Sequence, residues 1–185
     1  MFVAIPVPAD RRAAIDRLAG AFRRGGVRAR WVRPERLHLT LRFLGEVPEA
    51  EVAGIVRALD GAVASRPSFR LRFGRPGAFP SPRRPRVLWL GVEADAALGG
   101  LYADVERALA AVGHPGDGKA FRPHLTLGRV RPGGGPAAAE ALARATCGAE
   151  TVDGFEVSRV DLVCSVPGPA EYEHRTLHTA FLAND

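Results

Sequence analysis

One tetrapeptide occurs twice in this chain, and the duplication constrains the fold more than any other feature. Residues 38–41 read His-Leu-Thr-Leu, and residues 124–127 repeat the same four residues. The same order of elements is predicted around each copy: a strand, a helix, the His-Leu-Thr-Leu strand, a turn and a helix that begins with proline. Self-similarity on this scale predicts a duplicated unit, and therefore two lobes related by a pseudo-twofold axis.

Hydrophobic periodicity and helix-end signals place the elements of both halves. The first half is predicted to contain a strand over 2–7, a helix from Asp10 to Gly25, a strand over 37–44, a helix from Pro48 and a strand over 69–73. The second half is predicted to contain a strand over 87–92, a helix capped by Asp95 and ended by Gly113, a strand over 122–130, an Ala-rich helix from Pro136 and two or three strands over 151–181. Residues 74–86 are rich in Gly and Pro and are predicted to form a loop.

These elements predict an α+β protein. We expect two pseudo-twofold-related lobes, each an antiparallel sheet flanked by helices, with the active-site groove between them. Because no long polar linker separates the halves, residues 1–185 are expected to form a single domain. Its lobes are expected to be built mainly from residues 1–75 and 87–185.

Composition excludes several classes of protein. The chain has 185 residues, of which 46% are hydrophobic and 25% are charged, as in globular proteins. No apolar run approaches the roughly 18 residues that cross a bilayer, so no membrane association is expected. The presence of only two cysteines, Cys147 and Cys164, argues against a disulfide framework and favours the cytoplasm. We expect a monomer without an obligate protein partner.

The charge of the chain is compatible with an anionic partner. The formal net charge is +6, and 25 of the 26 basic residues are arginine. Arginine binds phosphate as a bidentate fork, which favours RNA, although a GC-rich genome produces the same bias. Within the predicted loop, Arg83, Arg84 and Arg86 either clamp RNA or are simply solvated.

The repeated tetrapeptide predicts acid–base chemistry. Side chains alternate along a strand, so His38 and Thr40 share one face of their strand while the leucines face the other way. His124 and Thr126 are arranged alike, and a pseudo-twofold axis brings the two polar faces together across one cleft. Imidazole has a reference pKa near ~6.5, so one ring can accept a proton while the other donates one. The threonine hydroxyls can stabilise charge on a phosphodiester.

The alternatives for these histidines are an incidental strand position and a metal site. A single His-x-Thr strand is usually incidental, but two copies at equivalent places in a duplicated chain are not. A metal site is disfavoured because neither motif contains a carboxylate or a cysteine. The sequence therefore predicts no metal and no cofactor.

At these residues the chain resembles the 2H phosphoesterases, which are named for two His-x-Thr-x motifs. It is most similar to the RNA 2′,3′-cyclic phosphodiesterase branch, once called 2′-5′ RNA ligase. The resemblance lies in residues 2–5, 37–47, 87–92 and 121–129. It implies that His38 is the proton donor and His124 the proton acceptor, that the product is a 2′-phosphomonoester, and that no metal cofactor is needed.

Five further residues are candidates for substrate binding: Arg42, Phe43, Arg122, Arg129 and Tyr172. Strand parity places Arg42 beside His38 and Arg122 beside His124. Phe43 lies on the leucine face by parity, where it packs in the core unless it stacks on a base. Arg129 matches the family motif but has the wrong parity, which a bulge at Gly128 corrects. Tyr172 falls where the branch tends to have a tyrosine.

Three functions remain open from the sequence. The first is metal-independent hydrolysis of RNA 2′,3′-cyclic phosphate ends to 2′-phosphomonoesters. The second keeps the site but acts on a small cyclic phosphate nucleotide, and the third is a non-catalytic RNA-end binding module. His174 and His178, in the predicted final strand, are interpreted as surface or edge residues.

Overall fold

The computed structural model describes residues 1–147, 152–168 and 172–183, which contain four α-helices and ten strands. The helices are α1 (Ala9–Arg24), α2 (Glu49–Val63), α3 (Ala96–Ala111) and α4 (Gly135–Cys147), with a 3-10 helix η1 (Pro34–Arg36). The strands are β1 (Phe2–Pro6), β2 (Ala29–Trp31), β3 (His38–Phe43), β4 (Phe69–Leu71), β5 (Phe73–Ser81), β6 (Arg84–Val92), β7 (His124–Val130), β8 (Phe155–Val157), β9 (Arg159–Val166) and β10 (Glu173–Phe181). No helix in these ranges is long and apolar enough to cross a membrane.

One antiparallel sheet joins the two repeats. Its strand order is β10-β9-β1-β3-β7-β6-β5, with β2 paired to β7, and β4 and β8 form a separate two-stranded sheet. The repeats meet where Leu39 of β3 pairs with Leu125 of β7. Those leucines occupy the same position in the two tetrapeptides, so this antiparallel pairing relates the motif strands by a local twofold axis.

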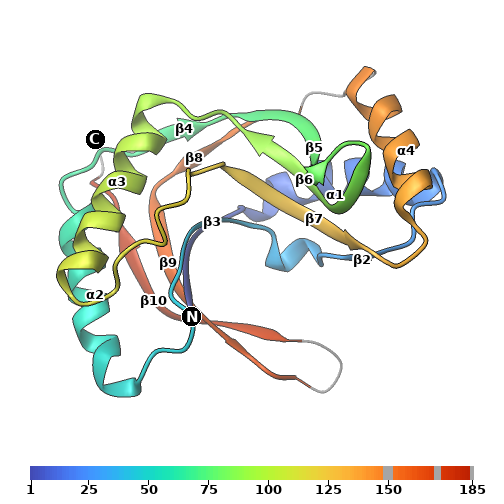
Figure 1. The fold of residues 1–185 in the computed structure, drawn as a ribbon. Helices are drawn as coiled ribbons and strands as arrows, with labels where there is room; N and C mark the ends of the chain where they lie inside the picture. Colours follow the sequence, from blue (N-terminus) through green and yellow to red (C-terminus); the bar gives the residue numbers. More distant parts are fainter. Residues whose placement is uncertain (148–151, 169–171, 184–185) are drawn as a thin grey trace.

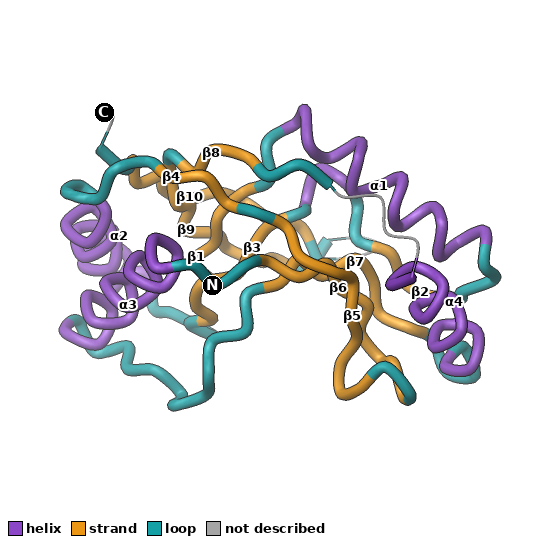
Figure 2. The backbone as a smooth tube through the Cα atoms, turned by 90° about the horizontal axis from the view of Figure 1, so that it is seen from above, coloured by secondary structure: helices purple, strands orange, loops and turns teal. Residues whose placement is uncertain are grey.

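Two lobes lie on either side of that axis (Figures 1 and 2). The first lobe consists of β1, β3, β9 and β10 covered by α2 and α3. The second lobe consists of β2, β5, β6 and β7 covered by α1 and α4. Helices cover the leucine face of the sheet, and one continuous hydrophobic core passes through both lobes. The predicted α+β fold with antiparallel sheets and flanking helices is confirmed.

The lobes differ from the contiguous segments 1–75 and 87–185, because each half of the chain contributes a helix and at least one strand to the other lobe. Strand β2 pairs with β7 in the second lobe, and β9 and β10 extend the first lobe beside β1. Helix α1 follows β1 but packs against α4, whereas α3 follows β6 but packs against α2 and β3. The first strand of each repeat, β1 or β6, ends where the two lobes meet, since Pro6 pairs with His38 and Gly91 pairs with His124. The chain therefore leaves each strand beside the neighbouring lobe. Hydrophobic periodicity reports which face of a helix is buried, but it does not report against which lobe.

The prediction of a loop over 74–86 is wrong, because this segment forms most of the β5–β6 hairpin. Prolines usually interrupt a sheet, as they have no N–H to donate. Strand β5 is the edge of the sheet, however, where Pro76 and Pro80 are tolerated. The strand predicted over 69–73 is divided, because β4 ends at Leu71 in the two-stranded sheet and Phe73 begins β5 of the main sheet. Elsewhere the predicted elements are confirmed, including the Asp95 cap, whose carboxylate accepts from the Leu98 N–H at 2.9 Å. The short β2 was not predicted.

Candidate active site

The two motifs present four polar side chains on the face of the sheet opposite the four α-helices. Leu39 and Leu125 are 1% and 0% exposed and belong to the core. His38, Thr40, His124 and Thr126 alternate with them and are only partly buried. Because Leu39 and Leu125 are paired, the antiparallel register sets His38 toward Thr126 and His124 toward Thr40. The predicted convergence of the motifs is thus produced by the central pairing of the sheet.

The backbone orients both imidazoles in the same way. Nδ1 of His38 lies 2.7 Å from the carbonyl oxygen of Arg36, and Nδ1 of His124 lies 2.6 Å from that of Arg122. A carbonyl oxygen can only accept a hydrogen bond, so Nδ1 carries a proton in each ring. Nε2 is then the nitrogen that can exchange a proton with a ligand. Each histidine is therefore held in the tautomer that suits acid–base catalysis.

His38 lies in an aromatic environment beside a cavity of about 400 Å³. The Phe2 ring stacks on the imidazole at 4.9 Å, and His174 meets it edge-on at 5.5 Å. Burial lowers the pKa of His38; the Arg36 carbonyl opposes this effect, and the imidazoles of His174 and His124 add to it. The neutral form of the His38 ring is therefore favoured at neutral pH.

The cavity beside His38 has acidic and aromatic walls. It is lined by side chains and backbone of Phe2, Ala4, Pro6, Glu35, Arg36, Leu37, His38, Asp161, Val163, Glu173, His174 and Thr176. Asp161 is buried and accepts a hydrogen bond from the Thr179 hydroxyl at 2.9 Å. His174 is exposed and lies on the edge strand β10, as predicted, and it also lines this cavity.

A bulge in β10 places the two C-terminal histidines on opposite faces of the strand. Residues four apart in a regular strand share a face, but Leu177 is inserted between Thr176 and His178 in the pairing with β9. His174 therefore lies in the cavity. His178 is on the other side, where its Nε2 lies 2.7 Å from Asp60 of α2. No local sequence signal marks this bulge.

The second lobe provides a different wall for His124. Phe79 meets the imidazole edge-on at 5.0 Å, and Trp89 lies 6.1 Å away. Both aromatic residues come from the β5–β6 hairpin, which is the segment predicted in part as a loop. Gly77 leaves room for the indole, since a Cβ there would lie 2.1 Å from the Trp89 ring. The hairpin thus shapes the site.

Equivalent bulges in β3 and β7 change which of the candidate binding residues face the site. Leu41 is extra in the pairing of β3 with β1, and Leu127 is extra in the pairing of β7 with β6. Each bulge reverses the parity of the residues after it. Phe43 consequently lies on the site face, 71% exposed and 6.0 Å from Phe2, instead of on the leucine face. Arg129 reaches the site face through the bulge at Leu127, one residue before the expected position.

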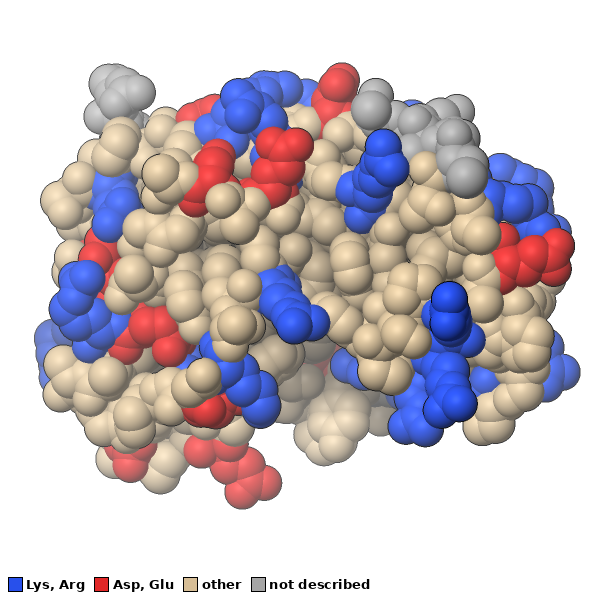
Figure 3. Space-filling model, turned by 45° about the horizontal axis from the view of Figure 1, so that its top comes forward, with Lys and Arg blue, Asp and Glu red and all other residues tan. Residues whose placement is uncertain are grey.

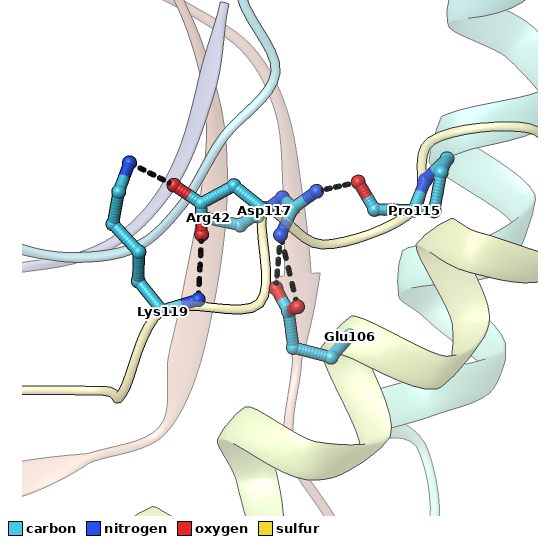
Figure 4. A network of polar contacts seen from close by, with 5 residues as sticks. All are labelled: Arg42, Glu106, Pro115, Asp117 and Lys119. Carbon is cyan, nitrogen blue, oxygen red and sulfur yellow. Dashed lines mark hydrogen bonds and ion pairs between the residues drawn. The ribbon is translucent and has the colours of Figure 1, made fainter.

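The bulge at Leu41 turns Arg42 away from the site, so the predicted place of Arg42 beside His38 is wrong. Its Nη1 lies 2.9 Å from Oε2 of Glu106 on α3, and its guanidinium also donates to the Pro115 carbonyl (Figure 4). Asp117, in the same segment, accepts from the backbone N–H and the side chain of Lys119 at 3.1 and 2.6 Å. Arg42 therefore fastens the first motif strand to α3 and to the segment that leads into the second motif.

Replacing Arg42 with alanine is expected to reduce stability and not substrate binding. The side chains of Arg42 and Glu106 are 12% and 21% exposed, so truncation leaves a desolvated carboxylate and costs about 1–3 kcal/mol. Chemical denaturation measures this loss, and the double variant R42A/E106Q should recover part of it. A raised KM for a cyclic mononucleotide at unchanged stability would contradict this structural role.

The remaining candidates contribute backbone contacts. Arg122 holds His124 through its carbonyl oxygen, and its side chain is exposed before β7 begins. Tyr172 is 58% exposed, and its carbonyl oxygen accepts from Nη1 of Arg36 at 2.7 Å. Substrate binding by either side chain stays a prediction.

Comparison with known proteins places this site in a family. The sequence profile of LigT-like phosphoesterases matches residues 5–89. The RNA 2′,3′-cyclic phosphodiesterase of Archaeoglobus fulgidus is 41% identical over 135 residues, which are 71% of this chain and 72% of the relative. The enzyme of that name from Geobacillus stearothermophilus is 35% identical over 87% of this chain, but the chain spans only 50% of that relative.

Solved structures show the same fold. The structure of TT0787 from Thermus thermophilus is 31% identical, covers 98% of this chain and 96% of its own, and has a TM-score of 0.72. LigT of E. coli in complex with phosphate is 26% identical, with coverages of 98% and 95% and a TM-score of 0.73. The chain belongs to the LigT-like phosphoesterases, within the RNA 2′,3′-cyclic phosphodiesterase branch of the 2H phosphoesterase superfamily.

Proposed function

We propose that this protein hydrolyses RNA 2′,3′-cyclic phosphate ends to 2′-phosphomonoesters by two-histidine acid–base catalysis. The observation that supports it best is the matched pair of imidazoles, each with Nδ1 fixed by the carbonyl two residues earlier and Nε2 left for proton exchange. The names of the relatives favour this substrate class.

The chemistry balances with one proton accepted and one donated. Nε2 of His124 accepts a proton from water as the water oxygen bonds to phosphorus. The bond from phosphorus to O3′ breaks, and Nε2 of His38 donates its proton to O3′. The hydroxyls of Thr40 and Thr126 donate hydrogen bonds to the non-bridging oxygens, where negative charge grows in the transition state.

The lowered pKa of His38 makes the donor role depend on the substrate. Burial and the neighbouring imidazoles favour the neutral ring in the free protein. A phosphodiester anion placed next to Nε2 favours the protonated ring and raises the pKa again. His38 is then charged when the substrate is bound, which is when a leaving alkoxide needs a proton.

The orientation of the substrate is set by in-line displacement. The attacking water and the leaving O3′ lie on opposite sides of phosphorus, so the ribose lies on the side of the donor His38. The cavity of about 400 Å³ opens on that side and takes the terminal base against Phe2 and His174. Its carboxylates suit a base with N–H donors. Phe43 lies next to Phe2 and extends the aromatic wall.

Turnover in excess EDTA tests the function directly. Because the proposed acid, base and hydrogen-bond donors are all side chains, an oligonucleotide with a 2′,3′-cyclic phosphate should yield a 2′-phosphate at an unchanged rate. Loss of turnover that Zn²⁺ or Mn²⁺ restores would contradict this mechanism. Turnover of cyclic mononucleotides alone would favour a small cyclic nucleotide as the substrate, and binding without turnover would favour an RNA-end binding module.

A further inference from the structure

The charges of this protein are divided between its lobes. Residues 9–36, 73–92 and 124–147, which supply the second lobe and its connections, contain 16 of the 26 basic residues but only 4 of the 20 acidic ones. The rest of the chain contains 10 basic and 16 acidic residues. Lys and Arg side chains accordingly prevail over the right half of Figure 3, where the second lobe lies.

Four of these arginines share one face of the β2–β7 pair. Arg30 lies directly opposite Arg129, and the Arg131 N–H donates to the Arg28 carbonyl at 2.9 Å, which continues the same register. The intervening Ala29 and Val130 pack against the core. The four exposed arginines therefore project from the opposite face.

That face is continuous with the catalytic face. Because of the bulge at Leu127, Arg129 and Arg131 lie on the same face of the sheet as His124 and Thr126. Alternate residues of a strand are about 6.7 Å apart. This spacing is close to that of successive phosphates in single-stranded RNA. Arg28 and Arg131 also border a hollow of about 430 Å³, whose other lining residues, Val27, Ala29 and Trp31, lie on the core side of the sheet.

Positive charge is concentrated along this face of the sheet. Neither β2 nor β7 contains an acidic residue. The two successive cross-strand arginine pairs therefore form a row of positive charge that leads away from the active site, and such a row attracts an anionic chain.

We propose that Arg28, Arg30, Arg129 and Arg131 form an arginine ladder that binds the backbone phosphates of RNA upstream of its cyclic end. This inference rests on the proposed function, because it starts from a cyclic phosphate held between His38 and His124. The uncharged base enters the acidic cavity of the first lobe, and the 5′ phosphates pass over the basic second lobe. The two lobes then recognise different parts of one substrate.

The double variant R28Q/R131Q tests the ladder away from the reacting atoms. The KM for a cyclic-ended oligonucleotide should rise on the order of tenfold, and the slope of log KM against log salt should fall by about 1.4. The kcat, and the KM for a cyclic mononucleotide, should stay the same. Thermal unfolding should show a Tm that is unchanged or higher, since two repelling charges are removed.

The variant R17Q/R24Q is the matched control. It removes the same charge from α1, which packs on the opposite, leucine face of the second lobe. An equal rise in KM for both variants would overturn the ladder, because net charge would then explain it. No change in KM for R28Q/R131Q would overturn it as well.

Binding separates failure of the ladder from failure of the proposed function. Fluorescence anisotropy with an RNA that ends in a 2′-phosphate requires no turnover. If the wild-type protein binds this RNA without hydrolysing cyclic ends, and R28Q/R131Q weakens the binding, the ladder stands and the proposed function fails. If cyclic ends are hydrolysed but both proteins bind equally, the ladder fails. Equally tight binding of a polyglutamate peptide of the same length would also overturn an RNA site.

Discussion

Replacing either His38 or His124 with alanine is expected to lower kcat on an RNA 2′,3′-cyclic phosphate by about 10²–10⁴-fold, as removal of a general acid or base typically does. Both rings lie on the open face of the sheet, so truncation removes little packing from the core. The matched control is H178A, which removes a histidine that contacts Asp60 of α2 on the other side of β10. Steady-state kinetics should show no comparable loss for the control.

An activated substrate distinguishes the two roles. The p-nitrophenolate of a 2′-phosphodiester leaves without a proton, so H38A should be far less damaging on it than on the RNA. H124A should stay severely impaired on both substrates, because water still needs a base. Rescue of H124A but not of H38A would reverse the donor and acceptor. A loss of only a few-fold for both variants on every cyclic phosphate would rule out the mechanism.

The pH profile gives an independent readout of the same roles. For the wild-type protein kcat/KM should follow a bell whose limbs belong to the interacting pair. Because the pKa of His38 is lowered in the free protein and raised by a bound anion, the alkaline limb of kcat should lie at higher pH than that of kcat/KM. In H38A, acting on the activated substrate, the alkaline limb should disappear.

The chemistry of the site was predictable from the sequence because it depends on short-range alternation. His38 and Thr40 are two positions apart in a strand with no irregularity between them, so they share a face, and the same holds for His124 and Thr126. The duplication then required only that equivalent strands meet, which the pairing of Leu39 with Leu125 provides. The first step uses the two-residue period of a strand, and the second uses the symmetry of the duplication.

The surroundings of the site were not predictable in the same way. Bulges at Leu41, Leu127 and Leu177 each shift the parity of the residues after them, and they determine the positions of Arg42, Phe43, Arg129 and His178. A bulge is stabilised by packing across the sheet, so its position cannot be predicted from the residues of one strand. The hairpin that carries Phe79 and Trp89 was not predicted for a related reason. A segment rich in proline is typical of a loop, and only the position of β5 at the edge of the sheet allows it to be a strand.

A large loss of kcat is also expected when Thr40 or Thr126 loses its hydroxyl group. Valine has nearly the shape of threonine but lacks the hydroxyl, so T40V and T126V each remove one hydrogen-bond donor. If these donors meet the non-bridging oxygens as charge develops, each variant should lower kcat by about 10²–10³-fold with little change in KM. Circular dichroism and thermal unfolding should show an unaltered fold, since both side chains are only partly buried.

Thr176 provides the matched control for the threonines, because it lines the cavity beside His38 and lies outside both motifs. T176V removes the same hydroxyl from the proposed nucleoside site, so it should change KM and leave kcat nearly intact. The contrast between kcat and KM separates binding of the growing charge on phosphorus from binding of the base. If T176V lowers kcat as much as T40V and T126V do, the hydroxyls act by holding the whole nucleotide in place. The motif threonines would then be positioning residues, and the transition-state charge would have to be stabilised by other donors such as Arg129.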